Sequence, residues 1–222
     1  MICISILARD TEEALSKMRR AESLADLFEL RMDAMTSCRP GEIISRAPRP
    51  VIATYRSRQE GGNGIAEYSE QVSLLSEALD AGAHYVDVEH RMAPDLRMGL
   101  LRKRGSSRII ISCHLLHETP PAEELDGLFH RLADTGADIV KIVSLARNPE
   151  DNLRIMGLIP LARKRGVPII AFCMGPIGRV SRIVSPLLGG YLTFAALTEG
   201  EESAPGQMTA LEIRNIMKVL MP

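Results

Sequence analysis

The sequence predicts a (β/α)8 barrel formed by a single domain over residues 1–222. Eight short apolar runs alternate with eight segments of helical spacing, and this alternation implies a parallel sheet. No composition break or linker divides the chain, and 222 residues suffice for one large core. About 250 residues are typical of such barrels, so the loops must be short. A doubly wound open sheet is the alternative, but the first strand-to-helix turn lacks its glycine-rich phosphate signature.

The predicted strands are short runs rich in aliphatic and β-branched residues. Such composition is typical of parallel strands that are covered on both faces. The eight runs are Ile2–Leu7, Leu27–Met32, Val51–Arg56, Tyr85–His90, Arg108–His114, Asp138–Ser144, Pro168–Met174 and Leu192–Leu197.

The predicted helices have recognisable start and stop residues. Thr11 or Asp10 caps the first helix, and Gly82, Gly136 and Gly166 each end a later one. The other predicted helices span Ala66–Ala81, Ala122–Thr135, Pro149–Arg165 and Met208–Leu220, with shorter ones at Pro40–Ala47, Pro94–Arg104 and Gly178–Leu188.

The composition excludes several classes of function. The net charge is −1, tryptophan is absent and only 4% of residues are aromatic, so we expect no nucleic-acid partner. No apolar run approaches ~18 residues, so we expect no membrane span. The four cysteines form no C-x-x-C pair and the N-terminus lacks a signal peptide, which indicates a cytoplasmic protein with reduced thiols.

Polar side chains gather in the C-terminal halves of several predicted strands. Glu29 and Arg31 are two residues apart and therefore share one strand face, as do Ser112 and His114. In a barrel these strand ends form the mouth, where active sites lie. The other polar residues of this kind are Arg56, Asp87, Glu89, Lys141 and Thr193, and Phe194 follows Thr193 in the last strand.

Lys141 lies in the middle of the predicted strand 138–144, among isoleucine and valine residues. A lysine buried there must find a partner or lose its charge. One interpretation is a structural ion pair with a carboxylate such as Glu89. The other is catalytic, because burial can lower the pKa of a lysine by up to ~3–5 units, and a neutral amine can form a Schiff base with a carbonyl.

His114 stands at the end of the preceding predicted strand. A lone strand histidine is more often structural, but one beside an amine can act as a general acid and base near neutral pH. The spacing of His114 and His117 also suggests a metal site, yet no cysteine or carboxylate nearby completes a ligand set. We therefore predict no metal.

Three loops carry further polar residues. Residues 56–64, RSRQEGGNG, are either a solvated connector or a polar clamp on a mobile loop, and they contain Glu60. Residues 174–182, MGPIGRVSR, lead into a helix whose start, with Arg182, suits an anionic substrate group. Residues 203–207, SAPGQ, on their own mark only the start of the last predicted helix.

Together these segments resemble the type I 3-dehydroquinate dehydratases, which are Schiff-base enzymes of the shikimate pathway. The matching segments occur in the family's order over nearly the whole chain, and the family fold is a (β/α)8 barrel. The segments are ELR (29–31), TYRSRQEGG (54–62), DVE (87–89), SCHLLHETP (112–120), ADIVKIV (137–143), MGPIGRVSR (174–182), TF (193–194) and SAPGQ (203–207).

The resemblance implies dehydration of 3-dehydroquinate to 3-dehydroshikimate. Lys141 would form an imine with the C3 ketone, and His114 would remove a C2 proton and then protonate the departing C1 hydroxyl. Glu60 would orient His114, and Arg182 would hold the substrate carboxylate. No metal or nucleotide cofactor is implied, because the lysine supplies the electron sink. The other implied binding residues are Glu29, Arg31, Arg56, Ser203 and Gln207, with Met174 and Phe194 as an apolar wall.

Two other functions remain as alternatives. An aldolase-like Schiff-base lyase also suits the strand lysine, and a non-catalytic barrel that binds a small carboxylate or a partner protein needs only the arginines. Phe172 departs from the family pattern at a position where relatives can carry methionine. We expect a homodimer that acts on a small-molecule substrate, without a fused shikimate dehydrogenase.

Overall fold

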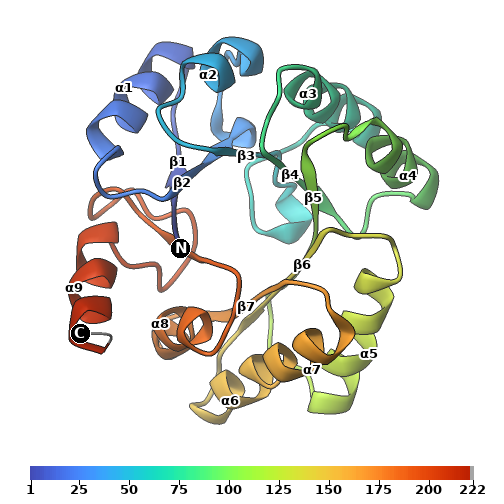
Figure 1. Ribbon diagram of the computed structural model, residues 1–222, viewed down its shortest axis with the longest axis vertical. Coiled ribbons are helices and arrows are strands. Elements are labelled where there is room, and N and C mark those ends of the chain that lie inside the picture. Colours follow the sequence, from blue (N-terminus) through green and yellow to red (C-terminus); the bar gives the residue numbers. More distant parts are fainter. Residues whose placement is uncertain (221–222) are drawn as a thin grey trace.

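The computed structural model describes residues 1–220 and confirms the predicted (β/α)8 barrel. Eight parallel strands form one nearly closed sheet in the order β7-β6-β5-β4-β3-β2-β1-β8, and helices surround it (Figure 1). The strands are β1 (Ile2–Ile6), β2 (Leu27–Arg31), β3 (Val51–Thr54), β4 (Tyr85–Glu89), β5 (Arg108–Leu115), β6 (Ile139–Leu145), β7 (Ile169–Met174) and β8 (Thr193–Ala195).

The helices lie close to their predicted positions. Asp10, one of the two predicted caps, accepts a 2.9 Å hydrogen bond from the Glu13 backbone N–H and so begins the first helix. The helices are α1 (Thr11–Ala21), α2 (Pro40–Arg46), α3 (Tyr68–Asp80), α4 (Pro94–Lys103), α5 (Ala122–Ala133), α6 (Glu150–Met156), α7 (Leu158–Arg165), α8 (Arg179–Leu187) and α9 (Ala210–Leu220), with 3-10 turns η1 (Met32–Ala34) and η2 (Arg58–Glu60).

The prediction of one continuous helix at 149–165 was wrong, because the segment forms two helices, α6 and α7, that meet at Gly157. Pro160 has no backbone N–H to bond the carbonyl of Met156, and its ring crowds that carbonyl. The Gly157 N–H bonds the carbonyl of Leu153 at 2.9 Å and ends α6. The proline therefore divides a segment whose apolar spacing is continuous.

Alternate residues of each strand point to opposite sides of the sheet, and this separates two cores. In β2, Phe28 and Leu30 pack in the outer core between strands and helices, whereas Leu27 packs in the inner core. Toward the C-terminal end, the inward positions of β2 carry Glu29 and Arg31 instead. The inner core also contains Cys3, Ile52, Ile110, Ile139, Ile170 and Leu192.

One junction of the barrel lacks a strand ladder within residues 1–220. Between β7 and β8, a single backbone hydrogen bond of 2.7 Å joins the Tyr191 N–H to the Ile169 carbonyl at the N-terminal ends of the strands. Farther along, Phe172 of β7 and Phe194 of β8 pack against each other with ring centroids 6.2 Å apart. We call this junction the β7–β8 seam.

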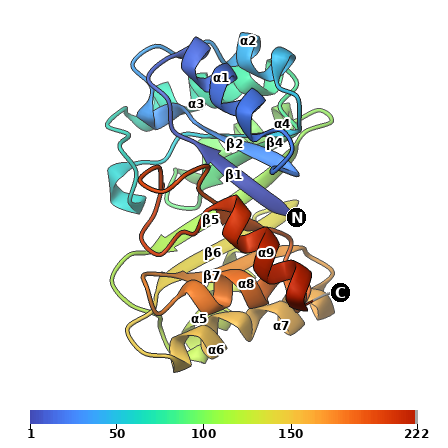
Figure 2. The same ribbon diagram turned by 90° about the vertical axis from the view of Figure 1, so that its left-hand side faces the viewer.

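The C-terminal strand ends and the loops after them form the mouth of the barrel. Figure 2 shows η2 and the loop at 196–209 on this side, with both marked termini on the other. No helix within the described residues is long and apolar enough to cross a membrane. The four cysteines are unpaired, as predicted, and the cytoplasmic location stays a prediction.

Candidate active site

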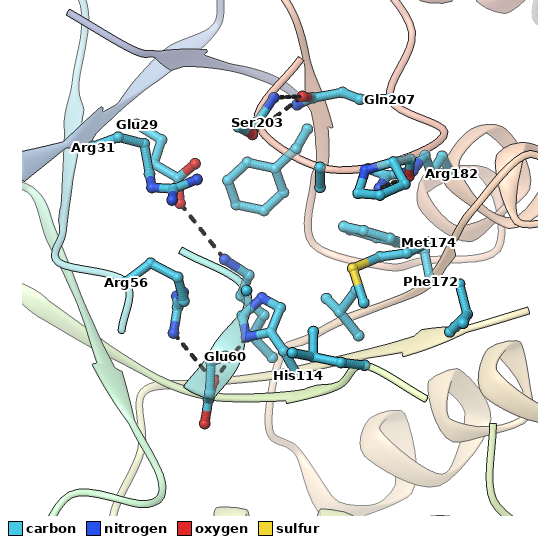
Figure 3. Close-up of a pocket in the computed structure, with 18 residues that line it drawn as sticks. Glu29, Arg31, Arg56, Glu60, His114, Phe172, Met174, Arg182, Ser203 and Gln207 are labelled. Atoms are coloured by element: carbon cyan, nitrogen blue, oxygen red, sulfur yellow. Dashed lines mark hydrogen bonds and ion pairs between the residues drawn. The ribbon is translucent and has the colours of Figure 1, made fainter. Parts of the chain in front are cut away.

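A cavity of about 330 Å³ opens at the mouth of the barrel, within the size range of small-molecule sites. It brings together every residue to which the resemblance gives a catalytic or binding role, although those roles stay predictions. Asp87, Glu89, Ser112 and Thr193, which were also placed at the mouth, do not line it. In Figure 3, the acidic side chains lie on one side, with Arg182 and Phe172 on the other. The predicted residues that line the cavity are Glu29, Arg31, Arg56, Glu60, His114, Lys141, Met174, Arg182, Phe194, Ser203 and Gln207.

Lys141 extends from β6 into the cavity and is 4% exposed. Its Nζ donates to Asp87 Oδ2 at 3.0 Å and lies 3.6 Å from Glu29 Oε1. It also lies 4.3 Å from the centroid of the Phe194 ring. Lys141 is therefore paired with carboxylates, as one interpretation of the sequence held, but the partner from β4 is Asp87 and not Glu89, the example given there.

Arg56 is hydrogen-bonded to Glu89, Glu60 and Asp87 and so links these three carboxyl groups. Its Nη1 lies 3.2 Å from Glu89, 3.3 Å from Glu60 and 2.9 Å from the Ser112 hydroxyl, and its Nη2 lies 2.6 Å from Asp87. Burial alone would raise the pKa of Asp87, but Arg56 and the neighbouring amine hold it well below its usual value. Asp87 is therefore an anion throughout the physiological range.

His114 and Glu60 form a hydrogen-bonded pair, with Nδ1 of the ring 2.8 Å from Oε2 of the carboxyl group. The pKa of His114 lies well below its usual range because of burial and then the charges of Arg56 and Lys141, so the ring is neutral at neutral pH. Burial raises the pKa of Glu60 to about 8, against the opposing charge of Arg56. The Oε1 atom of Glu60 has no hydrogen-bond partner, and the nearest cation on that side is Arg91, with Nε 3.9 Å away.

The protonation state of Glu60 sets the tautomer of His114. An ionised Glu60 accepts the Nδ1–H of a neutral ring and leaves Nε2 free to act as a base. A protonated Glu60 would instead donate to Nδ1 and place the ring proton on Nε2. The pair is therefore competent for proton abstraction only when Glu60 is ionised.

Glu29 and Arg31 point inward from β2 and are held by different partners. Glu29 accepts hydrogen bonds from the hydroxyls of Ser5 at 2.7 Å and Thr54 at 3.1 Å. Arg31 donates two hydrogen bonds to Asp33, at 2.8 and 2.7 Å. Such a bidentate pair fixes the plane of the guanidinium at the edge of the cavity.

The glycine-rich loop after β3 packs against Arg56 and is not a solvated connector. Asp33 accepts the backbone N–H groups of Arg56 and Asn63 at 3.1 and 3.0 Å. A Cβ on Gly62 would lie 2.2 Å from the Arg56 carbonyl oxygen, and one on Gly64 would lie 2.6 Å from it. Only glycine permits this close approach, which positions both Arg56 and η2.

Arg182 enters the cavity from α8 and is 1% exposed. Its Nη2 donates a long hydrogen bond of 3.4 Å to the Pro205 carbonyl, and its Nε has no partner. Burial lowers the pKa of Arg182 to about 10, so the side chain is still a cation at neutral pH. A buried cation with free donors suits an anionic ligand group.

The SAPGQ loop covers this side of the cavity. Ser203 donates its backbone N–H and its hydroxyl to Gln207 Oε1 at 2.6 and 3.1 Å. The Pro205 carbonyl accepts the Gly175 N–H at 3.0 Å. Gly206 has a φ of +77°, and a Cβ there would lie 2.1 Å from the Gly175 carbonyl oxygen. The motif therefore does more than begin α9, because its glycine lets the loop lie on the turn after β7.

Asp33, Asp87 and Glu89 are assigned no individual role from the sequence. The strand spacing of Asp87 and Glu89 places them at the mouth but does not predict their partners. Asp33 follows β2 without any pattern that predicts its pairing with Arg31. The cavity is also lined by Gly61, Leu116, Val143, Leu145, Phe172, Ala204 and Pro205.

The His114-x-x-His117 spacing does not create a metal site in the part of the chain that the structure describes. The ring of His114 is hydrogen-bonded to Glu60. No group of three or more histidine, cysteine, aspartate or glutamate side chains among residues 1–220 is placed to hold a metal ion.

Comparison with known proteins agrees with the geometry. A family model described as type I 3-dehydroquinase matches residues 2–221. The chain belongs to the type I 3-dehydroquinase family. A 3-dehydroquinate dehydratase of Pyrococcus abyssi is 38% identical to this family member over 99% of the chain and 98% of the relative. Membership makes the chain a lyase of the hydro-lyase type.

Relatives of this 3-dehydroquinase also include a longer plant protein. The chloroplastic bifunctional 3-dehydroquinate dehydratase/shikimate dehydrogenase of Arabidopsis thaliana is 36% identical over 97% of the chain, which spans 36% of that protein. A crystal structure of the type I 3-dehydroquinate dehydratase of Clostridium difficile, with covalent modified comenic acid, has a TM-score of 0.87 and 25% identity. The match covers 99% of this chain and 91% of the Clostridium difficile chain.

Proposed function

We propose that this 3-dehydroquinase converts 3-dehydroquinate into 3-dehydroshikimate through an imine on Lys141, with His114 as general acid and base. The observation that carries the proposal is the placement of a buried lysine and a neutral histidine on one cavity, each held by its own carboxylate. The reaction belongs to the shikimate pathway of aromatic amino-acid biosynthesis.

The chemistry begins when the Lys141 nitrogen adds to the C3 ketone and water leaves, which gives a cationic imine. His114 Nε2 takes a proton from C2, and the electron pair of that C–H bond moves into the imine to form an enamine. The enamine returns the pair, the C1–O bond breaks, and His114 gives its proton to the departing hydroxyl. Hydrolysis of the imine then frees the product and the lysine.

The carboxylates around Lys141 support this cationic intermediate. Asp87 and Glu29 lie 3.0 and 3.6 Å from Nζ, and Asp87 is ionised. Fixed charges that are already oriented stabilise charge that develops during reaction without reorganisation. Arg56 prevents the carboxylates from repelling one another and so holds this arrangement.

The distribution of charge orients the substrate. Glu29 and Glu60 lie on one side of the cavity, whereas Arg182 and Phe172 lie on the other (Figure 3). The cations Arg31 and Arg56 on the first side are already paired with Asp33 and Asp87, so a substrate carboxylate is attracted chiefly by the free donors of Arg182. We propose that Ser203, Gln207 and Arg31 bind its hydroxyls or carboxylate, while Met174 and Phe194 contact the ring.

Borohydride reduction tests the covalent step. The protein is incubated with 3-dehydroquinate and borohydride, and the adduct is located by intact mass and peptide mapping. We expect one reduced adduct on Lys141 in the wild type and in Lys103→Ala, a matched change at an exposed lysine of α4. Lys141→Ala should lose both the adduct and turnover, whereas His114→Ala should keep the adduct and lose turnover. Normal turnover by Lys141→Ala would refute the mechanism.

The two alternative functions predict other outcomes. An aldolase-like lyase would cleave a phosphorylated sugar and leave 3-dehydroquinate unchanged. A binding protein would retain a carboxylate ligand without forming product. We also propose a homodimer, and a single monomer mass in light scattering would contradict it.

A further inference from the structure

Arg182 requires a favourable contact that hydrogen bonds do not provide. It is 1% exposed, and among residues 1–220 no carboxylate lies within ion-pair distance of it. Within the described part of the chain, its Nε is unpartnered, and its single hydrogen bond, to Pro205, is long at 3.4 Å. Burial of a guanidinium in this state is costly unless another group offsets the lost hydration.

The ring of Phe172 provides that contact. The central guanidinium carbon of Arg182 lies 4.6 Å from the ring centroid, within the range of a cation–π interaction. Phe172 is 2% exposed, so water does not compete for the ring face. Unlike a carboxylate, an aromatic face attracts the cation without occupying any of its N–H donors. The donors of Arg182 therefore stay available to a ligand.

The position of Phe172 makes this contact specific. The residue stands in the β7–β8 seam, where Phe194 packs against it at 6.2 Å with an interplanar angle of 59°. Phe194 in turn lies under Lys141 Nζ. Each ring of the pair thus carries one cation, and of the two cations only Arg182, on Phe172, has no carboxylate partner among residues 1–220.

We propose that Phe172 is a positioning residue, whose ring face holds the Arg182 guanidinium in the cavity with its donors free and thereby sets the affinity for the substrate carboxylate. This inference rests on the proposed function, in which Arg182 binds that carboxylate. Without the ring, the binding of substrate must itself bring the guanidinium into place. The expected loss of affinity is roughly 5- to 30-fold, which corresponds to about 1–2 kcal/mol at 1.4 kcal/mol per tenfold.

Steady-state kinetics with 3-dehydroquinate separate positioning from folding. Phe172→Met keeps an apolar side chain in the seam but removes the ring, and we expect KM to rise roughly 5- to 30-fold while kcat changes less than about threefold. Phe172→Tyr keeps the ring face and should restore KM to within about threefold. Phe129→Met makes the same change at a buried phenylalanine of the outer core and should leave KM unaltered. An unchanged KM in Phe172→Met, or equal losses in Phe172→Met and Phe172→Tyr, would overturn the proposal.

A double-mutant cycle identifies the partner of the ring. In an Arg182→Met background, the change Phe172→Met should no longer raise KM, because there is no guanidinium left to position. If Phe172 only fills space, the two effects on KM will multiply, and the proposal fails. Competitive inhibition by quinate and by its carboxamide gives a second readout. The preference for quinate should shrink in Phe172→Met by the same factor as KM rises, and an undiminished preference would contradict the role.

Quinate binding distinguishes failure of this inference from failure of the proposed function. If the wild type does not turn over 3-dehydroquinate, the proposed function is wrong, yet quinate affinity can still be measured by calorimetry. Weaker quinate binding by Phe172→Met than by Phe172→Tyr then supports the positioning role. Equal binding by the two variants overturns it.

Discussion

Replacement of Arg56 by methionine is expected to reduce the free energy of unfolding by about 3–5 kcal/mol at pH 7. Arg56 is 3% exposed and contacts Asp87, Glu60 and Glu89 at 2.6 to 3.3 Å. Methionine fills part of the space but leaves these carboxylates buried beside one another. Removal of one partner from a buried ion pair costs that amount because the remaining charges lose a cation without regaining hydration. Lys141 still pairs with Asp87 and Ser57 still donates to Glu89, but neither replaces the charge of Arg56 among the three carboxylates.

The loss should depend on pH in a direction fixed by Asp87. Its folded pKa lies below its unfolded value, so its contribution to stability is present above the unfolded pKa of ~3.9 and is lost as the pH falls through the folded pKa. In Arg56→Met the lowering influence of the arginine is absent. The gap in stability between wild type and variant should therefore be widest near pH 7 and narrow below about pH 4.

Urea unfolding at several pH values measures this gap. Arg58→Met is the matched control, because Arg58 lies two residues away on η2 and is exposed, and a surface change of this kind costs within about 0.5 kcal/mol. A loss below about 1 kcal/mol for Arg56→Met, or a loss that is the same at pH 7 and at about pH 2.5, would refute the reasoning.

Two further predictions concern the pair at His114 and the loop over the cavity. Arg91→Gln should raise the pKa of Glu60 above about 8, because Arg91 opposes the effect of burial, and the acidic limb of the kcat/KM profile should move to higher pH. Arg58→Gln removes an equal surface charge, so an equal shift there would contradict a specific role for Arg91. Gly206→Ala should raise KM about tenfold and lower stability by about 1–3 kcal/mol, because its methyl group meets the Gly175 carbonyl. Gly200→Ala, also at positive φ but with open space around it, should leave KM unchanged, and equal KM effects would argue against the close contact.

The side-chain period of the strands explains why much of the site could be predicted. Glu29 and Arg31 are two residues apart, so both had to face the same side, and the cavity confirms that this side is inward. Lys141 could be recognised as a candidate site residue because a lysine buried among β-branched residues must find a partner or lose its charge. The resemblance to the family added the loop residues, whose local sequence predicts only turns and helix starts.

The pairing of charges could not be predicted, because it depends on packing between strands. Asp87 and Glu89 face the same side of β4, about 6.6 Å apart at the usual rise of a strand. Glu89, Ser112 and Lys141 are register partners across β4, β5 and β6, which would favour Glu89 as the lysine's partner. Glu89, however, accepts hydrogen bonds from Arg56 and Ser57, and the Lys141 amine pairs with Asp87.

At the β7–β8 seam, the cavity wall is formed by packed side chains and not by a strand ladder. Elsewhere around the barrel, the reacting groups stand on strands that are hydrogen-bonded to both neighbours, and a change of their side chains disturbs a buried charge or hydrogen bond. At the seam the wall consists of side chains, and Phe172 can be exchanged without the loss of a ladder bond between β7 and β8. A substitution of Phe172 is therefore expected to change ligand affinity while the strands that carry Lys141 and His114 keep their charges and backbone pairing.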